Sequence, residues 1–196
     1  MMLREALLEA AATSSVPSSD FDLNAEAERP EQALREAAVL VAVVESPDPK
    51  LILTKRSSAL KHHPGQISFP GGKVEETDAD LVAAALREAE EEIALTGVDV
   101  LGTLAPHQTV TGFVVSPVLG IVAQGYHVAP DHREVDEVFE VPLSHVMSPS
   151  NYMVESRRWR GQPRYYYAVP WGPYYIWGAT ARMLRALADR MEHVRA

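Results

Sequence analysis

The 196-residue sequence contains no cysteine, which excludes disulfides, thiolate metal sites and cysteine nucleophiles. It also lacks any apolar run close to the roughly 18 residues that a membrane-spanning helix needs. The N-terminal segment does not resemble a secretory signal, because Arg4, Glu5 and Glu9 interrupt its apolar part. We therefore expect a cytoplasmic protein that does not bind membranes.

Positive charge is also in short supply. The chain has 18 Lys and Arg residues against 27 Asp and Glu residues, a net charge of −9, which disfavours general nucleic-acid binding through phosphates. The imbalance is concentrated in one segment. Between Lys73 and Glu92, eight acidic and two basic residues give a net charge of −6. Such a local excess calls for a physical reason.

The length and the hydrophobic content of 46% predict one compact domain. We divide the chain into residues 1–36, an N-terminal helix followed by a polar preface that is partly mobile or packs across the surface, and a domain over residues 37–196. Strands and helices interleave irregularly, so we predict an α+β fold in which a mixed sheet lies between helices. Strands are expected at 37–45, 51–56, 98–104, 113–121, 138–141 and 165–169, and helices at 3–12, from 78–80 to 94–96, and at 179–194. The segment 57–72 is predicted to be an irregular loop.

The predicted central helix carries a cluster of acidic side chains. Because successive helical residues turn by about 100°, Glu88, Glu91 and Glu92 share one arc, Arg87 lies beside Glu91, and Glu90 points elsewhere. A solvated acidic face is the plain alternative. It fits poorly, because like charges at these spacings repel and lie at the helix end that disfavours anions. A bound Mg²⁺ or Mn²⁺ ion, which prefers oxygen ligands, would neutralise them.

Upstream, Gly71 and Gly72 form a turn that lets the backbone approach the same site closely. The combination resembles the signature of Nudix hydrolases, G-x5-E-x7-R-E-U-x-E-E-x-G-U, in which U is apolar. The residues that match are Arg87, Glu88, Ala89, Glu91, Glu92 and Leu95. The spacing from Gly72 to Arg87 is one residue too long, Asp78 or a neighbour stands in place of the first Glu, and Ala94 replaces the final Gly.

The segment before the helix resembles the additional motif of the coenzyme A diphosphatase branch of Nudix proteins. It runs from Leu53-Thr54-x-Arg56-Ser57 through Lys61 and Gly65 to Phe69-Pro70-Gly71-Gly72, with Lys61 in place of the usual Arg. The resemblance implies a Nudix α/β/α sandwich. It also implies cleavage of coenzyme A into 4′-phosphopantetheine and adenosine 3′,5′-bisphosphate.

We assign roles to these residues as hypotheses. Glu88, Glu91 and Glu92 hold Mg²⁺ or Mn²⁺ ions, and Arg87 orients the carboxylates. Arg56 and Lys61 contact substrate phosphates, and Gly71 and Gly72 bring backbone to the substrate. For the general base we favour Glu134 over Glu137, with a glutamate of the signature as an equal alternative. His107 is expected to serve the core or a turn.

Two other functions remain open at the level of sequence. One is a Nudix diphosphatase acting on a different nucleoside diphosphate derivative, and the other is a non-catalytic Nudix-fold nucleotide sensor. The basic and aromatic residues around Arg157 and Arg164 resemble a nucleic-acid stacking surface, but the acidic chain argues against that role. We expect a small-molecule partner and no nucleic acid, and leave a homodimer open.

Overall fold

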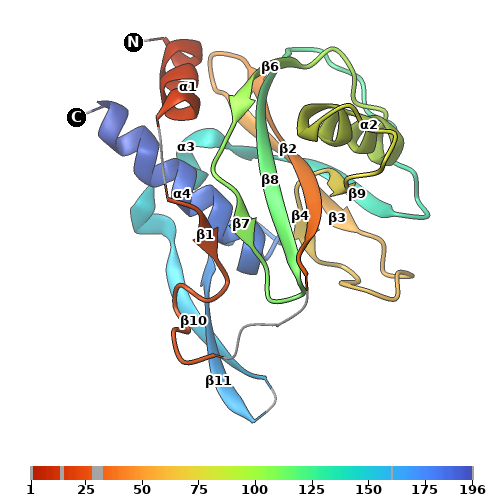
Figure 1. Ribbon diagram of the computed structural model, residues 1–196. Helices are drawn as coiled ribbons and strands as arrows, with labels where there is room; N and C mark the ends of the chain where they lie inside the picture. The colour runs from red at the N-terminus through yellow and green to blue at the C-terminus, as the bar shows by residue number, and fades with distance from the viewer. Residues whose placement is uncertain (1, 14–15, 28–32, 160, 196) are drawn as a thin grey trace.

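The computed structural model describes residues 2–13, 16–27, 33–159 and 161–195. Within them the chain forms one nine-stranded sheet, a separate two-stranded hairpin and helices on both faces of the sheet (Figure 1). The helices are α1 (Leu3–Ala12), α2 (Leu81–Ile93), α3 (Leu143–Val146) and α4 (Gly178–Arg195), with a 3₁₀ turn η1 at Pro149–Asn151. The strands are β1 (Ser18–Ser19), β2 (Arg35–Glu45), β3 (Lys50–Arg56), β4 (Ile67–Ser68), β5 (Gly71–Lys73), β6 (Asp99–Thr103), β7 (His107–Gln108), β8 (Phe113–Ala123), β9 (Val135–Pro142), β10 (Met153–Trp159) and β11 (Gln162–Ala168).

The sheet is mixed, as predicted. Its main path runs β1-β7-β8-β2-β3-β4, with β5 on β2, β6 on β8 and β9 on β3. The long strands β2 and β8 pair in parallel over their full length, from Arg35 opposite Phe113 to Glu45 opposite Ala123. Both are buried on two faces, which is why their sequences read as continuous apolar runs rather than as alternating patterns.

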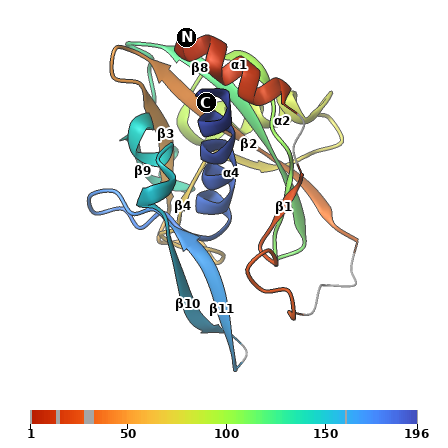
Figure 2. The ribbon, with the colours of Figure 1, turned by 90° about the vertical axis from the view of Figure 1, so that its left-hand side faces the viewer.

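Each face of the sheet has its own core. On one face, Ala85, Ala89 and Ile93 of α2 pack against Leu40 and Ile52 of the sheet. On the other face, α1 and α4 cover Val41, Leu53 and Leu119. Figure 1 shows α1 and α4 on one side of the long strands and α2 on the other, and Figure 2 shows the molecule from the side of α1 and α4. The predicted sandwich of helices around a sheet is confirmed.

The described part of the N-terminal segment adds to the core. Ala6, Leu7 and Ala10 of α1 are buried, and Ser18 of β1 pairs with His107 of β7. The Ser18 hydroxyl lies 2.9 Å from His107 Nδ1, and Asp20 Oδ1 lies 3.2 Å from Nε2 of the same ring. His107 is fully buried, which confirms its expected structural role.

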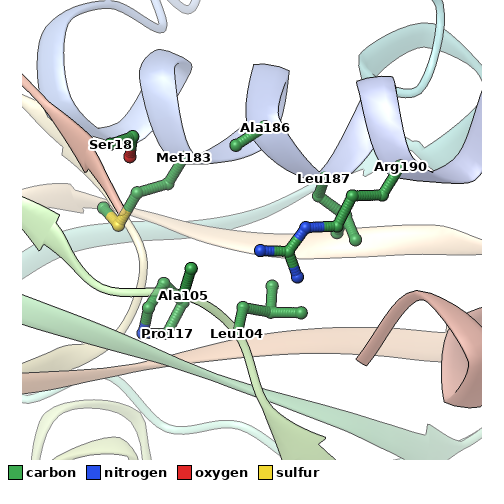
Figure 3. A pocket seen from close by; sticks show the side chains of 8 residues that line it. All are labelled: Ser18, Leu104, Ala105, Pro117, Met183, Ala186, Leu187 and Arg190. Atoms are coloured by element: carbon green, nitrogen blue, oxygen red, sulfur yellow. The ribbon is translucent and has the colours of Figure 1, made fainter. Parts of the chain in front are cut away.

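A small cavity lies where α4 crosses the strands. Its lining includes Met183 and Leu187 of α4, Leu104 and Pro117 on the sheet side, and Arg190 at one end (Figure 3). The cavity measures about 10 Å³, room for at most one water molecule. The Arg190 guanidinium donates to the Ala10 carbonyl at 3.2 Å, so this region joins α1 to α4 and is part of the packing.

The prediction of an irregular loop over residues 57–72 was partly wrong. Ile67 and Ser68 pair with β3 as β4, and β5 begins at Gly71 and pairs with β2. Buried Ile67 and Phe69 anchor this segment although Gly and Pro surround them. No helix in the described chain combines the length and apolarity that crossing a bilayer requires.

Candidate active site

The acidic helix α2 is held at both ends by local interactions. Asp80 caps its N-terminus by accepting a hydrogen bond from the Ala83 N–H at 2.8 Å. At the C-terminus, Ala94 adopts a left-handed φ of 55°, and its N–H donates to helix carbonyls. This is the conformation that glycine usually supplies after a helix. Ala94, which replaces the final Gly of the signature, therefore adopts the backbone conformation that ends the helix.

The Arg87 guanidinium donates hydrogen bonds to several polar groups on and near α2. Its Nε and Nη2 donate to the two carboxylate oxygens of Asp78 at 2.9 and 3.0 Å. Its Nη1 donates to Glu88 at 3.1 Å and to Glu91 at 3.0 Å, and Nη2 also reaches the Lys73 carbonyl at 3.1 Å. Arg87 thereby gathers two of the three predicted metal ligands and joins them to the preceding loop.

The bidentate bond from Arg87 lowers the pKa of Asp78 to about 2. Sequence spacing alone left the role of Asp78 undefined, because the distance from Gly72 to Arg87 exceeds the signature by one residue. The structure shows that the Asp78 carboxylate lies against the Arg87 guanidinium despite this extra residue. An acidic residue nine positions before the signature Arg was the only signal in the sequence.

Glu92 is the most enclosed carboxylate of the helix, with 4% of its surface exposed. Its Oε2 accepts from the Gly71 N–H at 3.0 Å, and its Oε1 lies 3.7 Å from Arg56 Nη1. Burial raises the pKa of Glu92 to about 7, with further contributions from the charges of Glu88 and Glu134. Three of the predicted site residues therefore meet at one point.

Glu88 lies against the second glycine of the turn. A Cβ atom added to Gly72 would fall 2.4–2.5 Å from the Glu88 carboxylate. Any residue other than glycine at position 72 would therefore displace this carboxyl group. Burial raises the pKa of Glu88, as do the charges of Glu91 and Glu134 to a smaller extent. Gly71 is constrained from the other side, because its Cβ would meet the backbone of β2 at 2.5–2.6 Å.

Glu134 lies close enough to raise the pKa of both Glu88 and Glu92. Backbone bonds fix its loop to the site: the Asp131 N–H donates to the Glu92 carbonyl, and the Ser57 N–H donates to the Glu134 carbonyl. The Glu137 carboxylate has a different partner: its Oε1 accepts a hydrogen bond from the Tyr174 hydroxyl at 2.5 Å.

Glu90, Lys61 and Arg56 differ in their exposure and in their partners. Glu90 is exposed, as its position on the helix predicts. Lys61 is exposed on its loop and has no hydrogen bond or ion pair to any described residue. Arg56 is half-buried, and its Nε is enclosed without a hydrogen-bond partner among the described residues. A buried guanidinium nitrogen of this kind favours an anionic partner.

The donor set fits a hard divalent cation. Glu88, Glu91 and Glu92 offer carboxylate oxygens only, and their repulsion and burial raise the pKa of Glu88 and Glu92. Within the described residues, no three acidic or histidine side chains already converge as a metal cage. Glu91 is turned outward to Arg87, with 61% of its side chain exposed. Binding of an ion would therefore include movement of Glu91 toward Glu88 and Glu92.

Comparison with known proteins agrees with this geometry. A family profile described as "NUDIX domain" matches residues 34–165, which includes β2, the glycine turn, α2 and the Glu134 loop. Two relatives named "Uncharacterized Nudix hydrolase NudL" match 79% of this chain and 81% of their own length. The protein from Cronobacter sakazakii is 47% identical over 158 residues, and that from Enterobacter sp. strain 638 is 45% identical over 156 residues.

Solved structures share the fold. A MutT/nudix family protein from Enterococcus faecalis superposes with a TM-score of 0.57 at 14% identity, covering 86% of this chain and 66% of the other. The MutT protein from Methanosarcina mazei gives a TM-score of 0.50 at 18% identity, with 85% and 98% of the two chains covered.

Proposed function

This chain belongs to the Nudix hydrolase family, and from that membership we propose that it hydrolyses the diphosphate linkage of coenzyme A or of a coenzyme A derivative. Family membership supports a hydrolase that acts on a diphosphate compound. The choice of coenzyme A rests on the motif from Leu53 to Gly72, which leads directly into the site.

One observation supports the proposal most. Arg56 of the motif and Gly71 of the turn both lie at the buried Glu92 carboxylate, at 3.7 and 3.0 Å. The substrate motif and the acidic helix therefore meet in space, so a phosphate held by Arg56 would lie beside the carboxylates. Lys61, exposed on the same loop, is proposed as a second phosphate contact.

Glu88, Glu91 and Glu92 would hold Mg²⁺ or Mn²⁺. A bound ion of this kind polarises the diphosphate and lowers the pKa of a bound water. Arg87 positions the helix carboxylates through its bonds to Glu88 and Glu91, and Arg56 balances charge on the substrate phosphate. These are the contributions of the chain to transition-state stabilisation.

Glu134 is the general base that we propose. In the reaction, the water oxygen bonds to phosphorus, the bond from phosphorus to the bridging oxygen breaks, and the water proton passes to the Glu134 carboxylate. The charge of Glu134 raises the pKa of Glu88 and of Glu92, which supports Glu134 as the base. The Glu137 carboxylate instead accepts a hydrogen bond from Tyr174. A glutamate of α2 is the remaining candidate.

A substrate panel tests the proposal. The full chain is assayed with Mg²⁺ and with Mn²⁺ against coenzyme A, its oxidised and acylated forms, a dinucleoside polyphosphate and a nucleoside diphosphate sugar. We expect the highest kcat/KM for a member of the coenzyme A group. A higher kcat/KM for another diphosphate would transfer the proposal to that substrate, and tight nucleotide binding without hydrolysis of any compound would indicate a sensor.

A further inference from the structure

The hairpin of β10 and β11 projects from the nine-stranded sheet as a separate two-stranded sheet (Figure 2). A two-stranded sheet by itself is at best marginally stable in water, and a third strand or a packed face stabilises it. Nearly all of β10 is exposed. Its exposed side chains include three large apolar ones, Met153, Val154 and Trp159, at 44, 52 and 49%. The mechanism proposed above uses none of them.

The Asn24 side chain shows which backbone groups of the hairpin point outward. Its amide accepts a hydrogen bond from the Tyr165 N–H and donates one to the Tyr165 carbonyl, both at 2.8 Å. Tyr165 therefore turns its backbone polar groups away from β10. Ser156 lies opposite Tyr165, and two opposite residues of an antiparallel pair either bond each other or both point outward. Ser156 thus points away from β11.

The outer edge of β10 has unpaired backbone groups. Val154 and Arg158, two positions on either side of Ser156, point outward like Ser156 itself, because the direction alternates along a strand. No described residue bonds to the N–H or carbonyl groups of these three residues at this edge. On β11 the Asn24 side chain occupies the equivalent position at Tyr165. The edge of β10 is therefore the one open to another strand.

The sequence of β10 is complementary to itself in one register. A two-fold axis places one residue opposite its own copy. With Ser156 on the axis, Glu155 lies opposite Arg157 of the partner subunit, and Met153 lies opposite Trp159 of the partner subunit. Opposite charges and paired apolar side chains in these positions stabilise adjacent strands. An axis at Glu155 or at Arg157 would instead place like charges opposite each other.

The hydrogen bonds and the remaining charges agree with this register. Val154 lies opposite Arg158 of the partner subunit, so all three outward-pointing residues of each strand are paired, with two hydrogen bonds for each pair. The two copies of Arg158 are offset by four residues, or about 14 Å along the strands. This exceeds the Debye length of about 8 Å at physiological salt, so their repulsion is largely screened.

Contacts with the rest of the protein hold β10 in place. The Tyr175 hydroxyl donates to Oε2 of Glu155, which leaves Oε1 for a second donor. The Arg157 guanidinium stands 5.3 Å over the Trp177 ring. Because the strand is already ordered, pairing with another strand costs little additional conformational entropy.

We propose that two copies of this chain associate through their β10 strands, with Ser156 on the two-fold axis. The product is a four-stranded sheet of order β11-β10-β10-β11, with two Glu155–Arg157 ion pairs between the subunits. No residue of the carboxylate site takes part, so this association is independent of the proposed function.

Cysteine cross-linking tests the register, because the chain has no cysteine of its own. In Ser156→Cys the two Cα atoms would lie about 5.5 Å apart, within the range of a disulfide. We expect a covalent dimer after mild oxidation or treatment with a short bismaleimide. In the matched control Arg158→Cys the two thiols are about 14 Å apart along the strands and should not cross-link. Equal cross-linking of the two variants would overturn the register.

Charge reversal tests the ion pairs by sedimentation velocity. Glu155→Arg and Arg157→Glu each place like charges opposite each other in a homodimer, so each variant should dimerise at least about tenfold more weakly than wild type. An equimolar mixture of the two variants restores both opposite-charge pairs and should form a heterodimer with nearly the wild-type affinity. A folding defect in either variant would not produce this rescue. A mixture that associates no better than the separate variants would contradict the pairing.

Ser156→Pro tests the backbone bonds. It removes the outward N–H without removing a bond to β11, so we expect a monomer with an unchanged circular dichroism spectrum. Ser156→Thr keeps the N–H and should remain dimeric. A wild-type chain that stays monomeric up to near-millimolar concentration would overturn the proposal and would show that the arginines of β10 protect the edge from pairing. A dimer that Ser156→Pro retains would place the interface elsewhere.

Discussion

The Glu92 carboxyl group is buried, accepts a hydrogen bond from a backbone N–H and lies near a positively charged side chain. The Gly71 N–H and Arg56 face its two oxygens, so its position is set from both sides. Glu90, two residues earlier on the same helix, is exposed to solvent. The same substitution, Glu to Gln, can therefore be compared at Glu92 inside the site and at Glu90 outside it.

Glu92→Gln should lower kcat by more than about 100-fold, because loss of outer partners of a metal ligand alone costs about 10–100-fold. Glu90→Gln should keep nearly full activity. Steady-state kinetics at saturating Mg²⁺ measures both variants, with circular dichroism to confirm the fold. Near-normal turnover in Glu92→Gln would remove this residue from the metal site.

The two glycines of the turn should respond differently to alanine. In Gly72→Ala the new methyl group displaces the Glu88 carboxylate, so kcat should fall by about 100-fold, as expected for a misplaced catalytic group, with a small change in stability. In Gly71→Ala it meets the backbone of β2 instead, so unfolding free energy should fall by about 1–3 kcal/mol. Urea denaturation together with kinetics separates the two; equal effects on both measures would contradict the assignment.

At the scale of elements, the contact between α2 and the loop before it fixes the position of the acidic face of the helix. Arg87 joins the two through Asp78 and the Lys73 carbonyl. The hydrogen bonds lower the pKa of Asp78 to about 2, below its usual value near 3.9. A carboxylate with a lowered folded-state pKa stabilises the protein above the unfolded-state pKa and loses that effect as the pH falls.

Asp78→Asn should therefore lower the Tm relative to wild type at pH 5–7, and the difference should shrink as the pH falls from about 4 to about 2. Thermal unfolding followed by circular dichroism across this range measures it. Glu76→Gln, an exposed neighbour in the same loop, is the matched control and should behave like wild type. A Tm difference that is independent of pH would show that the ion pair is not its source.

Element by element, sequence prediction worked where local periodicity governs structure. The helix at 81–93 and the outward position of Glu90 follow from helical geometry, and Asp80, which caps the helix, lies within the predicted start at 78–80. The strands β1, β4, β5 and β7 and the hairpin strand β10 were missed. Their pairing depends on partners distant in sequence, such as Ala38 opposite Gly72, and this information is not contained in a local pattern.

The same limit applied to the site. The three carboxylates and Arg87 share one helix, so their spacing predicted their common face. The contact of Arg56 with Glu92 and the nearness of Glu134 depend on how β3 and the loop before β9 lie across α2. The resemblance of the motifs suggested these residues, and the tertiary structure places them together.

At the scale of the whole molecule, the N-terminal helix contributes to the core that supports the sheet from the side opposite α2. Leu7 is fully buried, whereas its neighbour Leu8 is 41% exposed. Helix α1 contacts α4, and the carbonyl of Ala10 accepts from Arg190. Helix α1 is therefore part of the folded unit.

Leu7→Ala should lower the unfolding free energy by about 2–5 kcal/mol, the usual cost of a buried Leu truncation. Leu8→Ala should change it by no more than about 0.5 kcal/mol, as is usual for surface positions. Equilibrium denaturation in urea measures both values. Equal small effects would mean that α1 detaches from the core in solution.

The most direct measurement is identification of both products after the full chain is incubated with coenzyme A and Mg²⁺ or Mn²⁺. We expect 4′-phosphopantetheine and adenosine 3′,5′-bisphosphate in equal amounts, and no product when EDTA removes the metal. Unchanged hydrolysis in EDTA would contradict the role of the α2 carboxylates as metal ligands. Intact coenzyme A under conditions in which another diphosphate is cleaved would contradict the proposed substrate.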